Sequence, residues 1–165
     1  MNIEERIKAL AQSEPFAGYS YVFDEWKSVD TALDRVALPA IVNILPLQGE
    51  ISKKNGRFRD MEYVQLAFLD KVMRDANGED NAAVYNRMKR LGMRFLEALN
   101  ATGDFEPFDE TLEYNVICEG LSPIVTGVLF IFQLTEKWHC EDWQEPQEEK
   151  PVTDEDEGDE DNPNG

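Results

Sequence analysis

The chain has 165 residues, 42% of them hydrophobic, which is enough for one domain with its own core. Its formal net charge is −18, and residues 141–165 hold twelve Asp or Glu against one Lys, so −11 belongs to this end and −7 to residues 1–140. The acidity disfavours nucleic acid as a direct, sequence-specific partner. The apolar run 128–132 is too short to span a bilayer, and the polar first residues are not typical of a signal peptide, so we expect no membrane partner and a cytoplasmic setting.

The first part of the chain predicts one helix and two strands. Residues 2–12 place Ile3, Ile7 and Leu10 on one helical face. Three segments follow: an aromatic strand over 19–23, a polar loop with a helical turn over 24–37, and a strand over 38–45. Pro46 would interrupt a central strand, so we expect a bulge or a sheet edge there.

A long hairpin is the clearest local prediction. Its first strand starts near Gln48, and a second strand returns over 57–70. Between them stands Asn55-Gly56, a pair that tolerates positive φ at both positions, as a tight hairpin turn requires.

The next segment predicts the main helix, over residues 81–100, after a loop over 75–81 with capping residues. One apolar stripe runs along it: Val84, Met88, Leu91, Phe95 and Leu99. Two final strands are expected over 112–118 and 124–136. The run 128–132 is apolar on both faces, so both should be covered. The main helix would cover one face, and the short first helix, helped by a neighbouring subunit, the other.

These elements predict an α+β domain over residues 1–140. We expect a mixed, mainly antiparallel sheet with a long β-hairpin, packed against one long helix plus a short N-terminal helix. Residues 141–165 contain Val152 as their only large apolar residue besides Trp143. Such a segment cannot offset the entropy cost of ordering it, so we predict a disordered acidic C-terminal tail.

A truncation tests this tail prediction. A chain that ends at Gln144 should melt within a few degrees of the full-length chain in a thermal unfolding measurement, because the removed residues bury little apolar surface. A large fall in melting temperature would show that the tail takes part in the fold.

No residue pattern predicts a catalytic or metal site. His139 is the single histidine and stands beside Cys140. Neighbouring side chains on an extended chain point to opposite faces, and a zinc site needs about four ligands. Glu62 and Glu113 would serve acid–base chemistry only if they faced inward with raised pKa values, and an outward orientation is the simpler interpretation. We therefore expect no enzyme activity, no cofactor and no metal.

The basic residues are unevenly distributed. Of the fifteen within residues 1–140, ten lie between positions 53 and 94. Four of them crowd the hairpin tip: Lys53, Lys54, Arg57 and Arg59. Four others lie on the main helix: Arg87, Lys89, Arg90 and Arg94. Solvated surfaces would account for both groups. The sharper interpretation is that the tip contacts an acidic surface of a neighbouring subunit, for which 109–113 and 24–34 are the candidate stretches.

The order of these elements resembles that of the tail terminator (minor tail) proteins of long-tailed bacteriophages. The resemblance covers about residues 2–136, and its most specific part is the strand 38–45, Leu-Pro-Ala-Ile-Val-Asn-Ile-Leu, followed by the long hairpin and one helix. It implies a small acidic protein that caps the growing tail tube as a ring. Related neck and head–tail joining proteins have similar architecture.

The resemblance therefore predicts a structural virion protein, assembled in the host cytoplasm. Its copies would form a homo-oligomeric ring, with a hexamer as one candidate size, and its partners would be tail-tube and head-connector proteins. The four basic residues at the hairpin tip are the candidate subunit contact. The alternative is an acidic inhibitor or DNA mimic that binds a basic host protein, which would need ordered carboxylates along a folded face.

Overall fold

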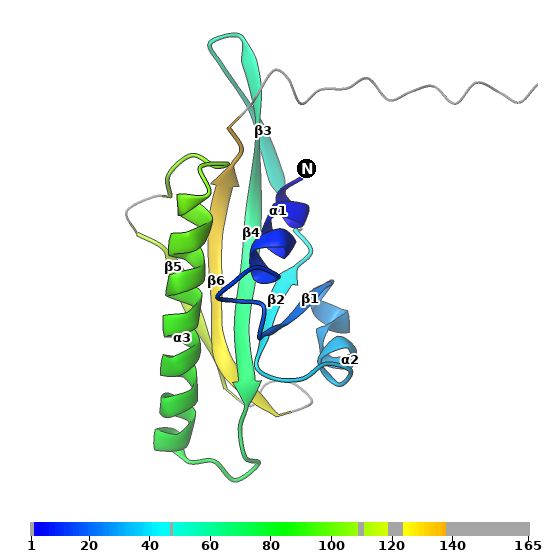
Figure 1. Cartoon of the computed structure of the whole chain (residues 1–165), viewed down its shortest axis with the longest axis vertical. Helices are drawn as coiled ribbons and strands as arrows, with labels where there is room; N and C mark the ends of the chain where they lie inside the picture. The colour runs from blue at the N-terminus through cyan, green and yellow to red at the C-terminus, as the bar shows by residue number, and fades with distance from the viewer. Residues whose placement is uncertain (1, 47, 109–110, 119–123, 138–165) are drawn as a thin grey trace, which may run out of the picture.

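The computed structural model describes residues 2–46, 48–108, 111–118 and 124–137 (Figure 1). They form the predicted α+β fold, with a six-stranded sheet, a long helix and a short N-terminal helix. The elements in chain order are α1 (Ile3–Ala11), β1 (Ser20–Asp24), η1 (Trp26–Ser28), α2 (Val29–Leu33), β2 (Ala40–Ile44), β3 (Gly49–Lys54), β4 (Arg57–Lys71), α3 (Gly78–Ala101), β5 (Glu113–Cys118) and β6 (Val125–Thr135). The predicted tail, His139 and Cys140 lie outside the described residues.

β4 organises the sheet, whose strand order is β1-β2-β4-β6-β5. β1 and β2 are parallel, and every other pair is antiparallel. β6 pairs with one side of β4 over β4 residues 61–71. On the other side of β4, β3 pairs with residues 57–62 and β2 with residues 65–69. β3 and β5 therefore lie on opposite sides of the β4–β6 pair.

The predicted hairpin is confirmed by its turn. Asn55 and Gly56 have φ values of 53° and 79°, and Lys54 is paired with Arg57 directly before and after them. Both residues tolerate this left-handed conformation, which lets the strands reverse in two residues.

The two predicted helices are confirmed, and both begin with a capping box. The Asn2 side chain accepts a hydrogen bond from the Glu5 backbone N–H, and Glu5 accepts one from the Asn2 N–H. α3 begins earlier than the predicted residue 81, because Asn77 and Asp80 form the same reciprocal pair. All five residues of the predicted α3 stripe are buried.

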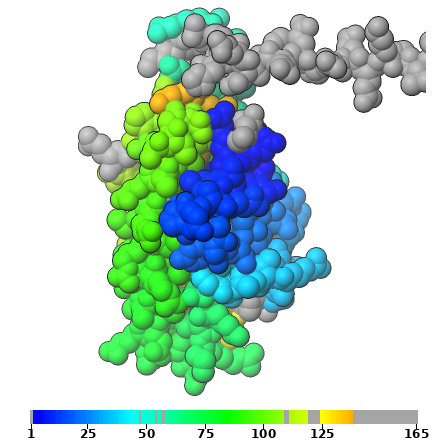
Figure 2. Space-filling view, viewed as in Figure 1, coloured from blue at the N-terminus to red at the C-terminus, as the bar shows by residue number. Residues whose placement is uncertain are grey.

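α1 packs beside α3 on one face of the sheet, which corrects the prediction that α1 covers the opposite face. Ile3 and Ile7 belong to the same core cluster as Phe95 of α3. Figure 2 shows the first residues of the chain lying directly against α3 on this face. Two helices on one face share a single continuous core, which neither could cover alone.

The other face of the sheet is covered by α2, within the segment predicted to be a loop with a helical turn. Val29 and Leu33 are fully buried there, against Val42 and Leu69. Cover of this face is incomplete along β6, where Ile131 is only half-buried. The prediction that both faces of β6 are covered is thus confirmed for the α3 face and only in part for the other.

The expected bulge or edge at Pro46 was wrong. β2 ends at Ile44, before the proline, and it lies between β1 and β4 rather than at an edge. Pro46 therefore removes no donor from the hydrogen-bond ladder of the sheet.

Candidate functional site

The candidate site is the outer part of the β3–β4 hairpin, which we call the arm and define as residues 49–60. β6 ends at Thr135, opposite Met61, so residues 57–60 of β4 continue with β3 as their strand partner. In Figure 1 the arm rises beyond the ends of α3 and β6. Such a two-stranded projection buries little surface of its own and is suited to contact another molecule.

One face of the arm carries two large apolar side chains in solvent. The register places Ile51 opposite Asp60 and Lys53 opposite Phe58, so these four side chains share a face. Ile51 is 73% exposed and Phe58 is 58% exposed. The Lys53 ammonium lies 5.3 Å from the centre of the Phe58 ring, a cation–π contact. The face thus carries an apolar pair with one basic neighbour, Lys53, and one acidic neighbour, Asp60.

The four predicted contact residues do not play one common role. Lys53 is exposed and lies on this apolar face. Arg59 is half-buried and forms an ion pair with Glu106 of the same chain. Lys54 and Arg57 are the last backbone pair of the ladder, directly before and after the turn. Of the predicted tip residues, Lys53 has its charge placed beside an exposed apolar surface, whereas Arg59 already has an acidic partner.

The sequence interpretation missed Ile51 and Phe58. Both stand among charged or polar neighbours in a hairpin, and strand alternation alone assigns neither to solvent nor to core. A signal was present, because the Asn55-Gly56 turn puts Phe58 opposite Lys53 by register, and a face that holds a lysine so near the tip is not buried.

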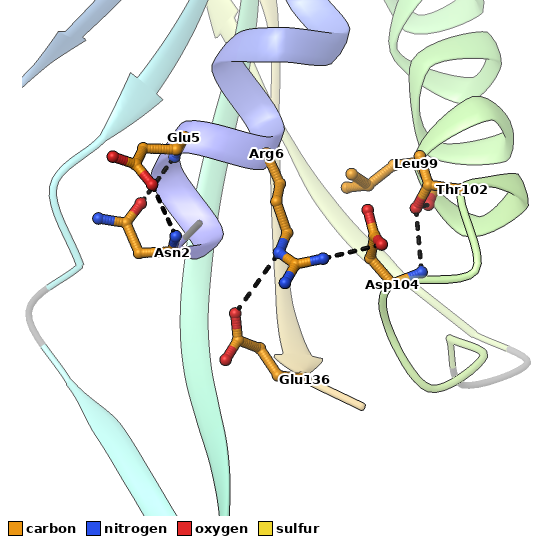
Figure 3. A network of polar contacts seen from close by, with 7 residues as sticks. All are labelled: Asn2, Glu5, Arg6, Leu99, Thr102, Asp104 and Glu136. Atoms are coloured by element: carbon orange, nitrogen blue, oxygen red, sulfur yellow. Dashed lines mark hydrogen bonds and ion pairs between the residues drawn. The ribbon is translucent and has the colours of Figure 1, made fainter. Parts of the chain in front are cut away.

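A polar network (Figure 3) meets the base of the arm at Glu136, whose backbone N–H donates a hydrogen bond to the Asp60 carbonyl oxygen. The Arg6 guanidinium of α1 lies 2.8 Å from the carboxylate of Asp104, in the loop after α3. It lies 3.8 Å from the carboxylate of Glu136, just after β6. The Glu136 Oε1 atom is buried and accepts no hydrogen bond within the described part of the chain, since 3.8 Å is too long for one. Arg6 thus joins three distant segments beneath the arm.

Carboxylates gather at this base. Burial raises the pKa of Glu62 above its ordinary value, and the charges of Asp60 and Glu136 raise it further. Burial also raises the pKa of Glu136, against the opposing effect of the Arg6 guanidinium. Glu62 is thus half-buried rather than plainly outward-facing, whereas Glu113 is exposed.

The Glu62 environment predicts a pH-dependent stability. The folded chain holds the Glu62 proton more tightly than the unfolded chain, so stability is lost as the pH rises from the ordinary glutamate pKa, about 4.3, through the raised folded value. Glu62→Gln removes this loss and should therefore gain more free energy of unfolding over the wild type at pH 7 than at pH 4, measured by urea unfolding. Glu113→Gln is the matched control, and an equal gain there would contradict the account.

The described ranges were compared with the requirements of a metal site and of a membrane-spanning helix. They contain no group of three or more His, Cys, Asp or Glu placed to hold a metal ion. No helix among the residues that the structure describes is long and apolar enough to cross a membrane. Of the two acidic stretches predicted as contacts, residues 24–34 run from the end of β1 through η1 and α2, while Asp109 and Glu110 lie outside the described residues.

No protein-family model matches the chain, and no curated protein matches it in sequence.

Proposed function

We propose that this chain is a subunit of a homo-oligomeric ring that ends the tail tube of a long-tailed bacteriophage and joins it to the head connector. The observation that carries the proposal is the arm, a projecting hairpin whose apolar pair, Ile51 and Phe58, lies in solvent beside Lys53. Single exposed apolar side chains are ordinary, whereas apolar side chains grouped on one exposed face mark interaction sites, so the grouping of Ile51 and Phe58 on one face of the arm supports the proposal.

The fold supports the same proposal. One helix packed on a sheet, with a long hairpin after the strand β2, is the element order on which the resemblance to tail terminators rests. A ring needs a heterologous interface, in which one patch of each subunit meets a different patch of the next. The arm provides one such patch, and it lies far from the open edge strand β5.

The mechanism is geometric. One face of the ring would match the end of the tail tube and stop its growth, and the opposite face would receive the head connector. Exposed ion pairs contribute only about 0–1 kcal/mol each, so the basic residues of the arm would set the register of neighbouring subunits. Apolar burial of Ile51 and Phe58 would supply most of the affinity.

Charge reversal in the encoding phage tests the proposal. Lys53, Lys54 and Arg57 are changed to Glu together, and Arg59 is left in place because its change would also break the ion pair with Glu106. We expect tails of uncontrolled length and heads without tails, seen by electron microscopy. A four-residue version that includes Arg59→Glu should be at least as defective.

A control separates this effect from net charge. Three exposed basic residues away from the arm are changed to Glu in the same way: Lys8, Lys71 and Arg74. These particles should have normal tails. Normal, length-controlled, head-joined tails in the arm variant would rule out the arm charges as the subunit contact.

A further inference from the structure

An open groove with mainly apolar walls lies between α3 and β5. It encloses about 480 Å³, with Leu96 and Phe130 at its base and Met93 and Tyr114 at its sides. Tyr114 is paired with Phe130 across β5 and β6, and their ring centres are 6.0 Å apart. Cavities of about 300–1,000 Å³ bury drug-sized ligands, so this one has room for two large side chains.

The groove is open to solvent although its walls are apolar. Met93 is 51% exposed, Tyr114 44% and Val116, next along the same face of β5, 45%. β5 pairs only with β6 in the described sheet, so its outer edge also offers unpaired backbone groups. Natural proteins usually cover such an edge, and an apolar groove beside it indicates that another chain segment does so.

Two charged residues, Lys89 and Glu97, line the groove. Lys89 is held over the rings of Tyr85 and Tyr114, at 5.5 and 5.2 Å from their centres. Glu97, one of the lining residues, is exposed. The groove thus carries one cation and one anion, so an incoming segment with an apolar pair, one cation and one anion would match it in both polarity and charge.

The arm has this composition, but a subunit cannot place its own arm in its own groove. β3 and β5 are separated by β4 and β6, roughly 14 Å across the sheet at about 4.8 Å per strand. Phe58 is also eight residues along β4 from Leu66, which pairs with Phe130, a further distance of roughly 27 Å. Arm and groove lie at opposite edges, the arrangement that lets identical contacts repeat from one copy to the next.

We infer that the arm of one copy of this chain docks in the α3–β5 groove of the next copy, with Ile51 and Phe58 inside the groove and Lys53 facing Glu97. This inference rests on the proposed ring and names the two surfaces that form it. The main receiving surface is then an apolar groove with one carboxylate at its rim. It is not one of the acidic stretches predicted from the sequence.

Site-specific cross-linking tests the inference. Cys118→Ser and Cys140→Ser remove the native thiols from the full chain. Ile51→Cys, which leaves Phe58 in place, is made in one preparation, and Met93→Cys is made in a second of different tag size. The mixture is treated with a short bismaleimide, and we expect a mixed dimer that neither preparation yields alone. Ser13→Cys, at an exposed position away from the groove, replaces Met93→Cys in the control mixture.

A charge swap tests the proposed orientation. Lys53→Glu in the first chain should lower the yield of the mixed dimer about tenfold or more, because like charges facing each other across an interface cost binding free energy. Glu97→Lys in the second chain should restore it. Melting curves of each variant separate a lost contact from a lost fold.

Each other result overturns the inference. A mixed-dimer yield no higher than with Ser13→Cys means that the arm does not dock in the groove. Cross-linking that appears only after residues 138–165 are removed means that the groove belongs to the C-terminal segment of its own chain. Either result leaves the ring to be judged by the particle experiment above, so failure of the groove and failure of the ring are distinguishable.

Discussion

Replacing Phe95 with alanine should lower the free energy of unfolding by about 3–5 kcal/mol. Phe95 is fully buried in the C-terminal half of α3 and joins the helix to both the sheet and the N-terminal segment. Its ring lies 5.0 Å from that of Phe16, in an edge-to-face arrangement, and 5.6 Å from that of Phe68. Alanine would remove both ring contacts. It would also leave a cavity that closes only if α3, β4 and the segment around Phe16 move together.

Chemical unfolding of the two proteins measures this loss. Phe58→Ala is the matched control, because the same side chain is removed from the exposed face of the arm, and it should cost less than about 1 kcal/mol. A loss below about 1 kcal/mol for Phe95→Ala itself would mean that the α3 stripe does not pack on the sheet.

Gly127→Ala should cost about 3 kcal/mol or more, against the usual sign of this substitution. Alanine normally stabilises a strand relative to glycine, because the unfolded chain loses less conformational freedom. At Gly127 of β6, however, an added Cβ would overlap the carbonyl oxygen of Phe68 and lie 3.0 Å from the Leu69 Cα, both on β4. These are backbone atoms in the centre of the sheet, so the strands themselves would have to separate.

Gly18→Ala is the control for this prediction, because an added Cβ meets no atom within 4 Å there. It should leave the melting temperature nearly unchanged, whereas Gly127→Ala should lower it strongly in a thermal unfolding measurement. Equal melting temperatures for the two variants would contradict the close approach of β4 and β6.

Much of the fold was predictable from local patterns. The Asn55-Gly56 pair determines the hairpin by its positive φ values, and the α3 stripe from Val84 to Leu99 determines which side of the helix is buried. Both signals lie within a few residues, so they need no knowledge of the rest of the chain.

The parts that could not be predicted depend on distant residues. α2 is a five-residue helix, too short for its periodicity to be recognised, and its two buried residues Val29 and Leu33 show their role only against the sheet. The position of α1 beside α3 follows from contacts between Ile7 and residues far along the chain. No local pattern specifies which face of a sheet a short helix will cover.

The candidate site was likewise predictable from the sequence only in part. The basic tip was visible in the sequence as a charge cluster, but the Arg59–Glu106 ion pair joins residues that the fold alone brings together. The α3–β5 groove is likewise formed by Met93 and Tyr114, which come from separate elements. Sequence could therefore suggest that the arm makes a contact, but not which of its residues remain available for it.

The central claim is the proposed tail-ending ring, and its most direct test is the length distribution of phage tails made when the gene for this chain is deleted, determined by electron microscopy. If the chain forms the ring that ends the tail tube, the deletion should yield tails of variable, excessive length that are not joined to heads, and supplying the intact chain should restore normal particles. Tails of uniform wild-type length attached to filled heads, in the absence of the chain, would contradict the account.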